Sequence, residues 1–270
     1  AYNVAVGYDA GKNVTTGIQN TLIGGGAGDG INIGDDNVAL GYLALSGTGP
    51  GNKNTAIGKG ALQIASQTFA VNASVLDHDG AAGDARRTVT HTLDSKIEVG
   101  QVVTSASIFV ADTKVESITD STHFIIDRDA NSSFTSTTVL TFAGGQDAYN
   151  TAVGYNAGAA MTTGVQNTIV GAQAGDALTS GAQNSIFGTF AGTVLSVGNY
   201  NTAVGYAALG ASVDGDYNTA LGYLTLGAYE GGSDEGHNTA VGNKSQQAAT
   251  TGTSNTSLGS LSFGTGVLTG

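Results

Sequence analysis

A five-residue pattern, Asn-Thr-Ala-Val-Gly at residues 150–154, recurs along the chain in eleven imperfect copies and constrains its fold more than any other feature. Eight of the ten intervals between the asparagines of successive copies are 17 residues, one is 20 and one is 96. A fixed short period is typical of a solenoid, in which each repeat forms one coil that stacks on its neighbours. The chain is therefore expected to be a scaffold first. The copies begin at Asn3, Asn20, Asn37, Asn54, Asn150, Asn167, Asn184, Asn201, Asn218, Asn238 and Asn255.

Every copy closes with an apolar residue followed by Gly. Apolar and β-branched triplets favour strands, and Gly is needed where φ is positive or where another backbone approaches too closely for a Cβ. The density of Gly argues against helix. Each copy thus predicts a short strand and a tight turn, with the Gly as a structural position of the backbone. These turn glycines are Gly7, Gly24, Gly41, Gly58, Gly154, Gly171, Gly188, Gly205, Gly222, Gly242 and Gly259.

A second Gly, three residues before the asparagine in eight copies, predicts a return turn; Gly164 is an example. Each 17-residue coil is then expected to hold two short strands and two turns. The predicted fold class is all-β, a parallel β-roll or β-solenoid with 17-residue coils and one inserted small β-domain.

The two faces of the predicted strand are both partly apolar. Side chains alternate across a strand, so the second and fourth residues of a copy face one side and the third faces the other. We assign the second and fourth residues to the coil interior. The third residue is Ala in seven copies, including Ala152 and Ala203, and this small-residue face is expected to meet other chains. The sequence thus predicts a parallel homotrimer, intertwined or side by side.

The interval of 96 residues exceeds the usual 17 by 79 residues, roughly Gln67 to Asp147. Runs of β-forming character at 86–93, 97–104, 114–119, 123–126 and 137–142 predict a small β-domain looped out of the roll. The expected division is 1–66 for the first coils, 67–147 for the inserted domain and 148–270 for the remaining coils.

The inserted segment holds five of the nine cations of an acidic chain. Binding groups tend to lie on excursions from a rigid scaffold, so this segment is expected to contact a partner. A spacer that only widens the shaft is the alternative. The expected contacts with an acidic cell-surface glycan or protein are Arg86, Arg87 and Lys96.

The composition excludes several classes of function. A formal charge of −12 with only nine Lys and Arg argues against nucleic acid as a partner, because binding a polyanion needs clustered cations. The absence of Cys excludes disulfides and thiolate sites. No run of 18 apolar residues occurs, so a soluble chain without membrane insertion is expected. The start in mid-repeat suggests a fragment or a processed product.

Candidate metal sites are weak. Residues 127–131 carry the first ligand positions of a calcium loop, but an EF-hand needs Gly and Glu where Ser132 and Thr138 stand. The segment 77–79 with His91 and His123 contains suitable ligand types, but their spacing does not require a metal. A hairpin turn and surface histidines are the preferred interpretations, and no metal or cofactor is expected.

Catalytic groupings are also lacking. No Gly-x-Ser-x-Gly elbow occurs, and the paired acids at 35–36 and 234–235 fall in predicted turns where solvent leaves them ordinary. We therefore expect no enzyme and no catalytic residues.

The tyrosines follow the repeat. Five directly follow the turn Gly and four directly precede the asparagine, so they are expected to form columns on successive coils. Stacked rings about 4.8 Å apart stabilise such a roll, and exposed rings are also suited to stacking on sugars. Stabilisation is the preferred interpretation of Tyr2, Tyr8, Tyr42, Tyr149, Tyr155, Tyr200, Tyr206, Tyr217 and Tyr223.

The Asn-Thr-Ala-Val-Gly-Tyr copies, with returns such as Thr-Thr-Gly at 162–164, resemble repeats of tail-fibre-like proteins of marine bacteriophages. The pattern is also similar to the head repeat of trimeric autotransporter adhesins, a left-handed parallel β-roll. In the insert, 99–103 with 113–119 resembles a small β-module of phage fibres. Both families imply homotrimers that bind surfaces, without catalysis.

Two functions follow from these expectations. The first is a structural fibre segment of a phage virion, with host-surface recognition through the insert. The alternative is a bacterial cell-surface adhesin or extracellular filament. A third, weaker hypothesis is a monomeric ice- or glycan-binding solenoid, which would need a flat Thr array. The Thr column at the second position is single and is assigned to the core-facing side.

Overall fold

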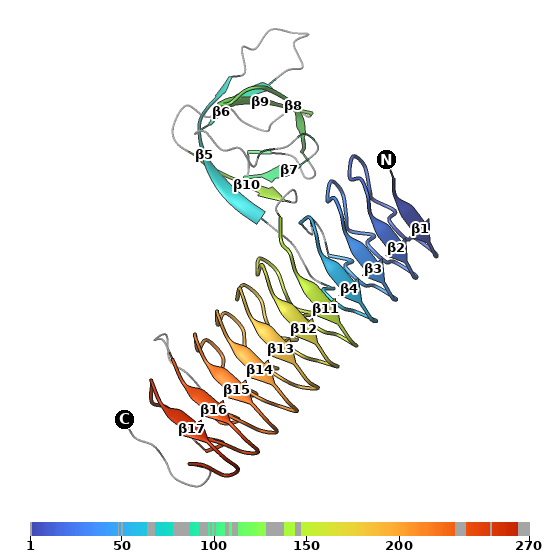
Figure 1. Ribbon diagram of the computed structural model, residues 1–270. Helices are drawn as coiled ribbons and strands as arrows, with labels where there is room; N and C mark the ends of the chain where they lie inside the picture. The colour runs from blue at the N-terminus through green and yellow to red at the C-terminus, as the bar shows by residue number, and fades with distance from the viewer. Residues whose placement is uncertain are drawn as a thin grey trace.

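The computed structural model describes residues 2–47, 49, 51–63, 68–77, 87–91, 97, 99, 101–105, 108–109, 113–127, 138–143, 147–229, 236–248 and 250–263. Eleven three-residue strands form one parallel sheet in which each strand belongs to one coil (Figure 1). The described residues contain no helix. The strands, in spatial order, are β1 (Val4–Val6), β2 (Thr21–Ile23), β3 (Val38–Leu40), β4 (Thr55–Ile57), β11 (Thr151–Val153), β12 (Thr168–Val170), β13 (Ser185–Phe187), β14 (Thr202–Val204), β15 (Thr219–Leu221), β16 (Thr239–Val241) and β17 (Thr256–Leu258).

The stack is continuous across both irregular intervals. β4 pairs directly with β11, Thr55 with Thr151, although 96 residues separate them in the sequence. The 20-residue coil keeps the same register, with Thr219 opposite Thr239. The extra residues are therefore accommodated outside the strands. The predicted parallel β-solenoid with 17-residue coils is confirmed.

The prediction of two strands per coil is wrong for the described residues. Each coil contributes one three-residue strand, and most of the rest is turn or irregular backbone. The return segments still bond between coils, as where the Thr162 N–H donates to the Thr179 carbonyl at 2.8 Å. Left-handed residues such as Gln166 (φ 59°) interrupt the extended backbone in this segment. The described return segments are therefore bonded from coil to coil without forming a second strand.

The middle residue of the strand points into the coil, opposite to the assignment made from the sequence. Ala152 and Ala203 are fully buried within a single chain, while their strand neighbours Thr151 and Val204 are half-buried and exposed. The interior is narrow because a second Ala column from the turn, including Ala157, is also fully buried there. The prediction that the Ala face meets other chains is therefore wrong.

Replacing Ala203 with Leu is expected to destabilise the single chain by about 1–3 kcal/mol, because three extra carbons have to enter a filled coil interior. The matched control is Val213→Leu at an exposed position in the return segment of the same coil, which is expected to change the free energy of unfolding by less than about 0.5 kcal/mol. Denaturant unfolding of both variants measures the difference. Equal midpoints for Ala203→Leu and the wild type would contradict the burial of this column.

A ladder of asparagine side chains runs through the coils. From the second copy onward, the backbone N–H of each repeat asparagine donates to the side-chain oxygen of the asparagine in the preceding coil, at 2.8–3.3 Å. The Asn184 Nδ2 also donates to Asn167 Oδ1 at 3.0 Å and to the Gly198 carbonyl at 2.8 Å. The ladder thus joins each strand to the next coil and to the return turn of its own coil. It explains why the first position of every copy is Asn.

The turn glycines have a backbone that other residues do not adopt. All eleven have φ between +123° and +142°. A Cβ on Gly154 would lie 2.5 Å from the carbonyl oxygen of Gly171 in the next coil. Both the backbone angle and the close stacking therefore require Gly at this position.

The segment between β4 and β11 forms a second sheet, antiparallel and six-stranded, in the order β7-β10-β5-β6-β9-β8. Its edges meet, because the Val103 N–H donates to the Thr113 carbonyl at 2.8 Å and the Val115 N–H to the Gln101 carbonyl at 2.9 Å. The sheet has a buried cluster of its own, with Phe124 and Phe142 at its centre. The strands are β5 (Thr68–Asp77), β6 (Arg87–His91), β7 (Val102–Thr104), β8 (Val115–Asp120), β9 (His123–Ile126) and β10 (Thr138–Ala143).

Candidate functional surface

The outward side of the long sheet is a candidate functional surface. We call it the outer face and define it as the first and third residues of the eleven strands. The third residues form an apolar column that includes Leu40 (42% exposed), Phe187 (39%) and Val204 (38%). No strand residue of this sheet is charged, in a chain with 21 acidic and 9 basic residues. The outer face is therefore an uncharged strip on an acidic molecule.

The Thr column lies on this face, so its assignment to the core-facing side is wrong. In the inner strands of this sheet, β2–β4 and β11–β16, the first residue is half-buried while the second is buried, which places the hydroxyl-bearing side chains outward. The outer face thus combines a polar column and an apolar column. The threonines are Thr21, Thr55, Thr151, Thr168, Thr202, Thr219, Thr239 and Thr256.

Aromatic rings stack beside the strands where successive coils both carry one. Tyr200 and Tyr217 lie parallel with ring centroids 4.7 Å apart, and His237 continues the stack at 4.9 Å from Tyr217. In the column after the turn Gly, the rings of Tyr206 and Tyr223 are 5.5 Å apart. The ring faces inside these stacks are occupied by neighbouring rings, which fits the stabilising interpretation better than sugar binding.

A polar cluster links the coil before the inserted segment to the coil after it. The Lys53 Nζ donates to Asp147 Oδ2 at 2.6 Å, and the Tyr149 hydroxyl donates to the same oxygen at 2.9 Å. The hydrogen bond between Lys53 and Asp147 raises the pKa of Lys53 and lowers the pKa of Asp147. Both side chains are more than a third exposed, so this contact positions the chain rather than contributing much stability.

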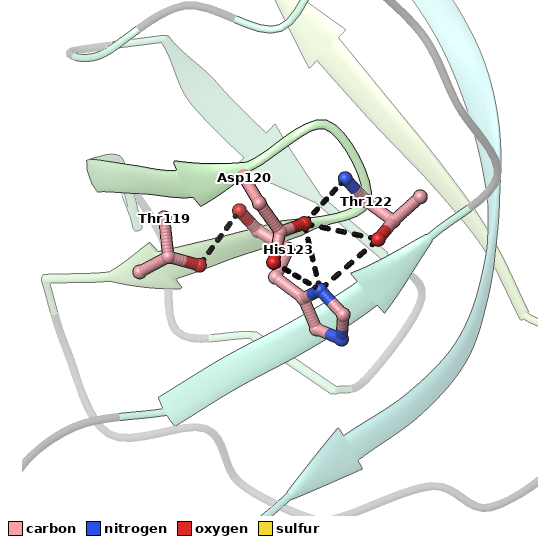
Figure 2. A network of polar contacts seen from close by, with 4 residues as sticks. All are labelled: Thr119, Asp120, Thr122 and His123. Carbon is pink, nitrogen blue, oxygen red and sulfur yellow. Dashed lines mark hydrogen bonds and ion pairs between the residues drawn. The ribbon is translucent and has the colours of Figure 1, made fainter.

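The turn between β8 and β9 holds a network of polar contacts around Asp120 and His123 (Figure 2). The Nδ1 of His123 lies 2.8 and 2.9 Å from the two carboxylate oxygens of Asp120. Asp120 Oδ1 also accepts the Thr122 N–H at 2.7 Å, and the hydrogen bond from His123 is the largest cause that lowers the pKa of Asp120 to about 2. One carboxylate and one imidazole tie a hairpin turn, and together they supply too few ligands for a metal.

The candidate metal ligands that fall within the described residues do not lie together. His91 is buried against the ring of Phe124, with centroids 5.4 Å apart, whereas His123 binds Asp120 at the surface turn. Asp127 Oδ1 accepts the Lys114 N–H at 2.7 Å. Within the described ranges, no group of three or more His, Cys, Asp or Glu residues is placed to hold a metal ion. Residues 78–79 and 128–131 lie outside those ranges.

The predicted receptor contacts are only partly described. The backbone of Arg87 belongs to β6 and pairs with Ile126. The side chain of Arg87 and the residues Arg86 and Lys96 lie outside the described part of the chain.

One of the two acidic pairs considered as catalytic groups lies within the described part. Its Asp35 side chain accepts the Ile18 N–H at 2.7 Å and thereby joins two coils. Residues 234–235 lie outside the described part.

Comparisons with protein-family models, with curated proteins and with solved structures found no match. Among the described residues, no helix is long and apolar enough to cross a bilayer.

Proposed function

We propose that this chain is a structural segment of a bacteriophage fibre, assembled as a parallel homotrimer in the virion. The observation that supports it is the unbroken stack of eleven coils, in which the first and last strands lie at opposite ends of the sheet (Figure 1). Such a stack extends in one dimension and transmits length and stiffness. This role requires neither catalysis nor a cofactor.

The resemblance to trimeric autotransporter heads favours one alternative, a bacterial cell-surface adhesin or extracellular filament. The same coil and the same assembly serve both functions. A virion-attachment domain in the flanking sequence would support the phage fibre, and a membrane anchor would support the adhesin.

The inserted segment is proposed to contact the host surface. It leaves the stack between β4 and β11 without breaking their pairing, so the solenoid does not need it for continuity. Its cations are the feature suited to an acidic surface glycan, and such attraction is screened over about 10 Å at 0.1 M salt.

Excision of residues 67–147, joining Ser66 to Ala148, is expected to leave the assembly intact and to abolish binding. Both forms should have the mass of a trimer in light scattering and appear as rods in electron micrographs, because β4 and β11 already pair. Binding is measured on bacterial cells and on an immobilised acidic polysaccharide at two salt concentrations.

The matched control is a pair of charge variants. Arg86→Ala with Arg87→Ala should weaken binding at low salt, whereas Lys12→Ala, an exposed cation of the solenoid, should not. A globular monomer would contradict the fibre, and unchanged binding after excision would make the insert a spacer.

A further inference from the structure

We propose that the outer face is the surface through which copies of this chain associate, in parallel and in register. The inference rests on the proposed fibre function, in which several copies run side by side. The Ala face cannot be the contact surface, because it is buried inside the coil. The Thr column and the apolar column of the outer face lie on the side of the strands away from the coil interior.

The apolar column of the outer face, formed by the third residue of each strand, exposes large side chains. Ile23, Leu40 and Phe187 are each at least 36% exposed. A contiguous apolar surface of this kind on a soluble chain marks a contact site. A net charge of −12 would make like chains repel, and a strip without charge is where two of them approach with least repulsion. A second copy therefore fits this face better than a cationic partner does.

The outer face repeats regularly, at the spacing of the strands. Eleven strands spaced about 4.8 Å apart give a face about 50 Å long. With the residues that flank each strand it is about 15 Å wide, or roughly 750 Å², close to the 800 Å² per partner of a stable interface. A ladder with this spacing is matched along its whole length only by a surface with the same spacing. Another copy of this chain supplies one.

One bulky residue on the outer face distinguishes the possible registers between two copies. Phe187 is the one aromatic residue on the eleven strands, and the same column holds Val170 and Val204 in the coils on either side. In register, equal side chains meet at each level. If one copy is displaced by one coil along the other, the ring of Phe187 meets a valine of the partner copy instead of its Phe187. The coil at each end of the stack then also loses its partner. Phe187 therefore favours a single alignment among otherwise similar ones.

Single cysteines test the proposal directly, because the chain has none of its own. Thr21→Cys and Val153→Cys place one thiol in each outer-face column, and Thr163→Cys places one on an exposed return turn as the control. After treatment with a short thiol-to-thiol cross-linker, the two outer-face variants are expected to give covalent dimers and the control to stay monomeric on denaturing gels. Thr21 lies near one end of the stack, so a dimer through it also requires parallel chains.

A charge variant gives an independent readout. Val153→Lys should leave the circular dichroism spectrum unchanged and convert the assembly to monomers in light scattering, because identical cations would meet at one level. Thr163→Lys should leave the mass unchanged. An assembly that cross-links only through Thr163→Cys, or that survives Val153→Lys, would overturn the outer face as the contact while leaving the fibre standing. A wild-type monomer would overturn both.

Discussion

Replacing Asn184 with Asp is expected to lower the free energy of unfolding by more than about 3 kcal/mol at neutral pH, because it buries a charge with no cation to balance it and turns one carboxylate oxygen toward two acceptors. The Asn184 Nδ2 donates to two acceptors, Asn167 Oδ1 and the Gly198 carbonyl. A carboxylate oxygen in its place faces both acceptors and cannot donate. Chemical denaturation followed by circular dichroism measures the loss.

The pH dependence of this variant has a defined sign. Burial among acceptors raises the folded-state pKa of the introduced carboxyl above its unfolded value of about 3.9. The loss of unfolding free energy relative to wild type is therefore complete at any pH above the pKa of the carboxyl in the folded state. The loss becomes smaller as the pH falls from there toward the pKa of the carboxyl in the unfolded chain. The matched control is Asn243→Asp, an exposed asparagine after a turn Gly, expected within about 0.5 kcal/mol of wild type. If both variants unfold alike, the asparagine ladder contributes nothing specific.

The repeat pattern predicted the solenoid because the same strand and turn have to recur at every copy. It did not resolve which side of the strand is inside, since Thr-Ala-Val is partly apolar on both sides. A usable signal was present in the first position. Asn and the third-position Ala alternate onto the same side, and a polar residue in every copy at the start of an apolar strand indicates a buried ladder of amides. That consideration places Ala152 inside and Val153 outside, as observed.

Other features carried no sequence signal. Gln166 and Leu209 adopt left-handed backbone with φ of 59° and 53°, and residues of this kind are indistinguishable by type from others in the coil. The left-handed region costs such residues roughly 1 kcal/mol each. Bonds between coils offset the cost, as where the Gln166 N–H donates to the Ala148 carbonyl at 2.7 Å. Stacking, rather than local preference, decides these positions.

In the inserted segment, the predicted β runs overlap β6 to β10, whereas β5 was missed. β5 (Thr68–Asp77) is the longest strand, and it contains Ala, Asn and Ser, which have little preference for strands. It is paired along both edges, with β10 and with β6. Its conformation follows from partners distant in sequence, which local propensity does not report.

Replacing Gly154 with Val is expected to destabilise the chain by at least about 3 kcal/mol, and replacement with Ala by at least about 2 kcal/mol. The φ of +142° is strained for any residue with a Cβ, at a cost of about 1–3 kcal/mol. The added Cβ would also lie 2.5 Å from the Gly171 carbonyl oxygen, which is backbone and is fixed by the next coil. The wild-type stack holds Gly154 in place through its N–H, which donates to the Ile57 carbonyl at 2.7 Å. The clash between an added Cβ and the Gly171 carbonyl can therefore be relieved only if the two coils move apart.

Gly25→Ala is the matched control for Gly154→Ala. Gly25 has no positive φ, a Cβ there would lie 3.3 Å from the movable ring of Tyr42, and the equivalent position of another coil is Ala172. Removing the freedom of Gly from the unfolded chain is worth about 0.4–1 kcal/mol where the backbone is compatible, so this variant should be as stable as wild type or slightly more stable. Denaturant midpoints compare the two. Equal effects of the two alanines would mean that the turn glycines are exchangeable, and the close stacking of coils at Gly154 would then not be what fixes Gly in all eleven copies.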